Sequence, residues 1–104
     1  MAKRILRNEE AEERFFAAVL SLQGIEECRA FFADICTDAE VGEMSRRLLA
    51  ASMLADGVSY LDVAEATGLS TATISRVSRA LKNGNGYADI LARIKEKEGG
   101  KEKE

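Results

Sequence analysis

The sequence contains no proline and no histidine, and only two of its 104 residues are cysteine. Because proline would kink or end a helix, its absence, together with 46% hydrophobic residues, predicts a folded and mostly helical chain. The sequence also shows no metal-ligand cluster, no phosphate-binding loop and no pair of carboxylates in an apolar setting. With histidine absent as well, these gaps argue against an enzyme, and we expect no metal site and no cofactor.

The two cysteines, Cys28 and Cys36, lie in apolar helical sequence and lack the spacing of metal ligands. We expect buried free thiols, which fit the reducing environment of the cytoplasm. The N-terminal sequence MAKRILRNEE lacks the apolar core of a signal peptide. No run approaches the roughly 20 apolar residues of a membrane span. We therefore expect a cytoplasmic protein with no membrane partner.

The formal net charge of -3 would by itself argue against a nucleic-acid partner. Binding depends on where the charges lie, however, and the stretch Ser70–Lys82 contains no acidic residue. Its cations are Arg76, Arg79 and Lys82, whereas acidic residues cluster at Glu9–Glu13, at Glu26 and Glu27, and in the C-terminal tail. One basic segment therefore stands out in an acidic chain.

Two apolar helices are predicted over about Asn8–Leu22 and Ile25–Ile35, on either side of Gly24. Each contains a pair of adjacent phenylalanines, and adjacent residues on a helix point about 100° apart, so each apolar arc is too broad for one neighbouring helix. A chain of this length also buries barely enough surface to be stable alone. We therefore expect these helices to pack on a second copy, as a homodimer, although a well-packed monomer core is the simpler alternative. The arcs comprise Phe15, Phe16, Val19, Leu20 and Leu22, then Phe31, Phe32 and Ile35.

The third and longest helix is predicted to begin at the capping box TDAE, in which Thr37 is the cap and Glu40 follows at the required spacing. A last helix is predicted over about Tyr87–Lys97, after the break NGNG. Residues 98–104 are too polar to pack, and we expect a disordered tail there. The sequence thus predicts one helical domain over residues 1–97.

Between these helices lies the segment LDVAEATGLSTATISRVSRAL, from Leu61 to Leu81. Ser59 and Ser70 are suitable caps for two short helices, and Gly68 between them can take the positive φ that a tight turn requires. The positions at which the two helices would touch are small or apolar: Val63, Ala64, Leu69, Ile74 and Val77. This spacing is typical of a helix-turn-helix, here over about residues 60–82, although an ordinary helical hairpin with a solvated basic face would share it.

The outward face of the second short helix is small and polar at its start and basic further on. Small residues let the backbone approach base edges, and the cations behind them reach phosphates or guanines. The sequence therefore predicts an interface for a double-stranded DNA operator. A helix-turn-helix recruited to bind another protein is the alternative, and RNA is less favoured because the aromatic residues are expected in the core. The outward residues are Ser70, Thr71, Ala72, Ser75, Arg76, Arg79 and Lys82.

The segment TATISRVSRALK resembles the recognition-helix region of the tryptophan repressor family, and most closely its regulators of unassigned effector. The resemblance extends more weakly over about Asn8–Ile94, with six helices in the same order. It implies an all-α, six-helix fold and an intertwined dimer that acts as a transcriptional repressor, with two recognition helices in successive major grooves. The repressor has a base-reading arginine at the position of Leu61, so a different operator preference follows. The implied DNA-facing positions are Leu61, Thr71, Ala72, Thr73 and Ser75.

The same resemblance implies a place for a small-molecule effector. Arg47 and Arg76 match the two arginines that sandwich the indole ring in the tryptophan repressor, and Thr37 matches a residue at the pocket edge. Two positions depart from the family: Val77 replaces a glycine, and Ala80 replaces a serine that helps to hold the amino group. The valine adds bulk and the alanine removes a hydrogen-bond partner. We therefore expect any effector to differ from tryptophan, and the alternative for both arginines is a role as phosphate contacts or as a surface pair.

Overall fold

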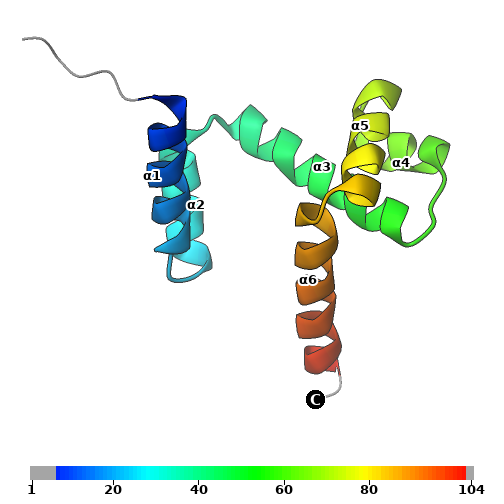
Figure 1. Cartoon of the computed structure of the whole chain (residues 1–104). Helices are drawn as coiled ribbons and strands as arrows, with labels where there is room; N and C mark the ends of the chain where they lie inside the picture. The colour runs from blue at the N-terminus through cyan, green and yellow to red at the C-terminus, as the bar shows by residue number, and fades with distance from the viewer. Residues whose placement is uncertain (1–6, 103–104) are drawn as a thin grey trace, which may run out of the picture. The chain divides into compact units, whose positions relative to one another are not determined.

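A computed structural model describes the backbone of residues 7–102 and the side chains of residues 7–99 (Figure 1). Over the described backbone the chain forms six α-helices and no strand, which confirms the predicted all-α, six-helix fold. The helices are α1 (Asn8–Leu20), α2 (Ile25–Ile35), α3 (Asp38–Ala55), α4 (Tyr60–Thr67), α5 (Thr71–Asn83) and α6 (Gly86–Glu102).

The contacts within one chain divide it into two compact units, an N-terminal unit Met1–Asp38 and a C-terminal unit Ala39–Glu104. That residues 1–97 form one domain stays a prediction. The N-terminal unit holds α1 and α2, and the C-terminal unit holds nearly all of α3 together with α4, α5 and α6.

The N-terminal unit is held together by phenylalanine rings. The rings of Phe15 on α1 and Phe31 on α2 stack with their centroids 6.1 Å apart. Phe16 lies 5.6 Å from Phe15, and Phe32 lies 5.4 Å from Phe31, so four rings form one cluster. No residue of α1 or α2 is fully buried, however. The two helices of one copy therefore leave much of their apolar surface open.

The cysteines differ from expectation in their burial. Cys28 and Cys36 are free thiols, but both are only half-buried. The reason is that α1 is the only other helix in the described part of this unit, so α2 is covered on one side and has no fully buried residue. The prediction of buried thiols is therefore wrong for a single copy of the chain.

The core of the C-terminal unit lies where α3, α4 and α5 meet. Small side chains on α3, Ala50 and Ala51, are fully buried and let the other two helices approach closely. Tyr87 and Leu91 of α6 pack against the edge of this core. The other buried apolar side chains are Val63 on α4, Leu69 in the turn, and Ile74 and Val77 on α5.

Helix α6 is longer than predicted and reaches Glu102, into the segment 98–104 that we expected to be disordered. Lysine and glutamate are good helix formers, so a helix rich in them can continue without a neighbouring helix. The backbone is helical over residues 98–102, residues 103–104 lie outside the described part of the chain, and the disorder of the tail stays a prediction.

Candidate nucleic-acid interface

Helices α4 and α5 are joined by a tight turn whose caps were predicted correctly. The hydroxyl of Ser59 accepts a hydrogen bond from the backbone N–H of Asp62 at 3.2 Å. The hydroxyl of Ser70 accepts one from the N–H of Thr73 at 3.1 Å. Gly68 ends α4 with φ at 73°, in the left-handed region where a side chain would be strained. The turn therefore lies at the residues that the sequence predicts.

The inward face of this helix pair is as expected. Val63 and Ile74 are fully buried, and Val77 is 2% exposed, so α4 and α5 are locked together through the core. Leu69, in the turn, is also buried, and Ala64 is half-buried against the same cluster. Because these contacts fix the angle between α4 and α5, the outward face of α5 is held rigidly.

Thr67 has a structural role that the sequence analysis missed. Its hydroxyl donates a hydrogen bond to the carbonyl of Val63 at 2.7 Å and accepts one from the backbone N–H of Leu69 at 3.2 Å. The side chain is buried with both bonds made. The sequence signal for these two hydrogen bonds is a threonine directly before the glycine that ends the helix, and this signal is weak.

All but one of the side chains predicted to meet DNA are exposed. Thr73 is the exception, being half-buried. Its hydroxyl accepts a hydrogen bond from the Ser70 hydroxyl at 3.0 Å, so it takes part in the cap of α5. The exposed members are Leu61, Ser70, Thr71, Ala72, Ser75, Arg76, Arg79 and Lys82.

The cations of α5 are electrostatically uncompensated. Among the residues that the structure describes, no carboxylate forms an ion pair with Arg76, Arg79 or Lys82. In contrast, two acidic side chains of the C-terminal unit pair with cations of helices other than α5: Glu43 with two arginines of α3, and Asp56 with Lys95 of α6. The positive charge of α5 is therefore free to attract an anion.

Two of the predicted effector residues, Arg47 on α3 and Arg76 on α5, belong to the C-terminal unit. Arg47 forms an ion pair with Glu43 at 3.5 Å, and its Nε atom is buried without a hydrogen-bond partner. Arg76 is exposed on α5. Thr37 belongs to the N-terminal unit, and the effector role of all three residues stays a prediction. Val77 belongs to the hydrophobic core, and a ligand would have to displace that packing.

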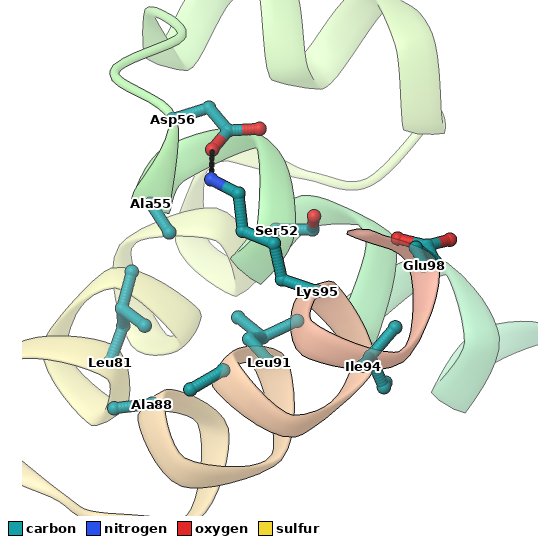
Figure 2. Close-up of a pocket in the computed structure, with 10 residues that line it drawn as sticks. Ser52, Ala55, Asp56, Leu81, Ala88, Leu91, Ile94, Lys95 and Glu98 are labelled. Atoms are coloured by element: carbon teal, nitrogen blue, oxygen red, sulfur yellow. Dashed lines mark ion pairs between the residues drawn. The ribbon is translucent and has the colours of Figure 1, made fainter. Parts of the chain in front are cut away.

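Two cavities of the C-terminal unit lie away from the outward face of α5. One, of about 350 Å³, has aliphatic walls that include Leu81, Leu91 and Ile94, as Figure 2 shows. At its rim the Nζ of Lys95 lies 3.7 Å from a carboxylate oxygen of Asp56. The other, of about 500 Å³, is an apolar groove lined by Leu48, Ala80, Gly84, Gly86, Tyr87 and Ile90.

The described residues include no cluster of three or more histidine, cysteine, aspartate or glutamate side chains placed to hold a metal ion. Nor does any helix within residues 7–102 combine the length and the apolar character that crossing a bilayer requires.

The family model for the Trp repressor protein matches residues 10–95, which include all of this helix pair and most of the helices around it. The chain belongs to the Trp repressor family. It is therefore a DNA-binding regulator in the general sense, and the helix pair α4–α5 lies in the part of the chain that the family shares.

Similar proteins from bacteria support this membership. The chain is 46% identical over 94 residues to the uncharacterized protein YerC of Bacillus subtilis (strain 168), with 89% of each chain covered. A crystal structure of a TrpR-like protein from Eubacterium eligens ATCC 27750 matches with a TM-score of 0.78 and 46% identity, covering 82% of this chain and 89% of that one. A candidate Trp repressor from Staphylococcus aureus matches with a TM-score of 0.78 and 42% identity, covering 83% and 87%.

Proposed function

We propose that this Trp repressor family member is a homodimeric transcriptional repressor that binds an operator in double-stranded DNA through α4 and α5. The observation that carries the proposal is the outward face of α5. It begins with small, exposed residues at its capped end and continues with three cations that no described carboxylate neutralises. A rigid helix with this arrangement suits the major groove, where base edges carry sequence information and phosphates line the sides.

The residues of this face divide into two roles. Ser70, Thr71 and Ala72 lie at the start of α5, where short side chains allow the helix to come close to base edges. Arg76, Arg79 and Lys82 follow and supply the contacts to phosphate or guanine. Leu61, which is 77% exposed at the start of α4, offers an apolar contact of the kind that suits a thymine methyl group.

The dimer follows from the apolar surface that one copy leaves open. In the N-terminal unit, Phe16, Leu20 and Ile25 are 58%, 85% and 66% exposed, and no residue of α1 or α2 is fully buried. So short a helix pair cannot reach stability without burying that surface. A second copy buries the exposed apolar surface of these helices and of the groove beside Tyr87. The resulting dimer presents two α5 helices to the DNA.

We further propose that L-tryptophan is not the effector. Val77 lies in the core, and Arg47 is already paired with Glu43, so neither offers the open space and free cation that an anionic, aromatic ligand would need. Arg47, Arg76 and Thr37 remain the residues to test for another small molecule. Because the proposed partner is genomic DNA, we infer a cytoplasmic protein. Because we assign no reaction to the site, we infer that the protein is not an enzyme.

A protein-interaction role without DNA binding is the second candidate, and the overall negative charge favours it. Salt dependence separates the two. The experiment selects bound sequences from random duplex DNA and measures the affinity for the best sequence between 50 and 200 mM salt, a range over which 6–10 phosphate contacts cost roughly 10³–10⁵ in affinity. Enrichment of one palindromic sequence with a steep loss supports the proposal. Recovery of no sequence, or binding that ignores salt, would refute it.

A further inference from the structure

The cavity of about 350 Å³ in the C-terminal unit is bounded by the end of α3, by Leu81 near the end of α5, and by one side of α6 (Figure 2). We refer to it as the α3–α6 cavity. It shares no lining residue with the apolar groove that we propose the second copy covers, so the surface assigned to the dimer does not include it. Its aliphatic walls are Ala55, Leu81, Ala88, Leu91, Ala92 and Ile94.

The size and the walls of the α3–α6 cavity limit what it can hold. Small-molecule sites commonly enclose about 300–1,000 Å³, so this cavity lies at the small end of that range. Three of its wall residues are alanines, whose short side chains leave the space open. No aromatic side chain lines it, so a ring would find no stacking partner there. The walls therefore suit a small, branched aliphatic group better than an indole.

The rim of the α3–α6 cavity is charged. The Nζ of Lys95 on α6 lies 3.7 Å from a carboxylate oxygen of Asp56, and these side chains are 82% and 62% exposed (Figure 2). Ion pairs as exposed as this contribute little to stability, so a ligand can separate the two groups at small cost. Glu98 adds a second carboxylate and forms no ion pair with another described residue.

The charges of the rim decide the class of ligand. A simple carboxylic acid would pair with Lys95 but would face both carboxylates of the rim. A simple amine would pair with the carboxylates but would leave Lys95 without use. An α-amino acid satisfies all three groups, because its carboxylate meets Lys95 and its ammonium meets Asp56 and Glu98. The negative end of the α3 dipole, where the last turn has no basic residue, also favours the ammonium beside Asp56.

We propose that the α3–α6 cavity binds a zwitterionic α-amino acid with a small aliphatic side chain. The side chain occupies the aliphatic walls, and the two charged groups stay at the rim, where Lys95 and Asp56 hold them. The site is separate from Arg47 and Arg76, neither of which lines this cavity. The proposal goes beyond the proposed function and does not depend on DNA binding.

The test titrates the full chain with L-leucine by isothermal calorimetry. Two analogues keep the same aliphatic group and remove one charge each: isoamylamine lacks the carboxylate, and isocaproic acid lacks the amino group. We expect L-leucine to bind saturably with a Kd of about 1 mM or tighter. Each analogue should bind at least about tenfold more weakly, because it loses a charge-assisted contact at the rim.

Three variants locate the ligand. Lys95→Gln should bind L-leucine about tenfold more weakly and should no longer distinguish it from isoamylamine, since the partner of the carboxylate is gone. Ala92→Leu places a larger side chain in the cavity wall and should abolish saturable binding without a change of charge. Lys97→Gln removes a cation of α6 outside the cavity and should bind as the wild type does. Circular dichroism shows whether each variant is folded.

Absence of saturable L-leucine binding to the wild type would refute the proposal. If either analogue bound as tightly as L-leucine, a single charge would decide recognition and the assignment to an amino acid would be wrong. Unchanged L-leucine binding in both Lys95→Gln and Ala92→Leu would place the ligand elsewhere. Arg47→Gln should leave L-leucine binding unchanged, and a loss there would assign the ligand to the predicted effector residues and overturn this site.

Discussion

The hydroxyl oxygen of Thr67 accepts a hydrogen bond from the backbone N–H of Leu69 at 3.2 Å, across the glycine that ends α4. Both residues are buried, so this bond satisfies a main-chain donor that water cannot reach. The bond stabilises the turn between α4 and α5, the helix that we propose enters the major groove of DNA.

Replacing Thr67 with valine keeps the shape of the side chain and removes the hydroxyl. The Leu69 N–H would then be buried without its partner, and we expect the free energy of unfolding to fall by about 1–3 kcal/mol. Denaturant unfolding measures the change. The control is Thr71→Val, an exposed site, for which a change of no more than about 0.5 kcal/mol is expected. Equal effects at the two positions would show that the Thr67 bonds contribute nothing.

Gly68→Ala tests the turn through its backbone alone. No atom lies within 4 Å of where the new Cβ would stand, so any cost comes from the φ of 73°. We expect a loss of about 1–2 kcal/mol. Gly99→Ala is the matched control, because its Cβ would also meet open space, its φ lies outside the left-handed region, and it lies outside the apolar groove that we propose the second copy covers. There we expect no loss, and a gain of about 0.4–1 kcal/mol if only the entropy of the unfolded chain changes.

The open apolar surface of α1 and α2 predicts that folding and assembly occur together. We expect sedimentation equilibrium to show a dimer at micromolar concentration, and thermal unfolding in one step whose midpoint rises with protein concentration. Leu20→Glu, on that surface, should weaken the dimer without touching the core of the C-terminal unit. A stable, folded monomer at micromolar concentration would contradict the dimer.

The effector proposal predicts that millimolar L-tryptophan gives no saturable heat in calorimetry and leaves operator affinity unchanged. The reason is the valine packed in the core at position 77 and the engagement of Arg47 by Glu43. Saturable binding that tightens the operator complex tenfold, a coupling of about 1.4 kcal/mol, would overturn it and restore a tryptophan-dependent mechanism.

The features that the sequence predicted well are those set by neighbours in the chain. Ser59, Gly68 and Ser70 could be placed because a cap or a left-handed turn depends on a few adjacent residues. The bounds of α2 follow from Gly24 before it and the change of pattern after Ile35. The inward face of the helix pair follows from helical periodicity combined with the spacing of the turn.

The features that escaped prediction depend on how helices cross. Tyr60 lies beside Arg79 and Lys82 because of the angle between α4 and α5, and periodicity within either helix says nothing about that angle. The half-burial of Cys28 depends on which helices cover α2. The extension of α6 to Glu102 escaped prediction for a different reason: polar composition predicts solvent exposure, and an exposed segment can still be helical.

The central claim is that the outward face of α5 binds DNA, and the salt dependence of Arg79→Ala tests it most directly. We predict weaker binding to a selected operator and to random duplex alike. The slope of log affinity against log salt should become shallower by about 0.9 for each phosphate contact that is lost. Arg93→Ala, on α6, should leave both quantities as in the wild type. If Arg79→Ala bound both duplexes with unchanged affinity and an unchanged salt slope, α5 would not face the DNA.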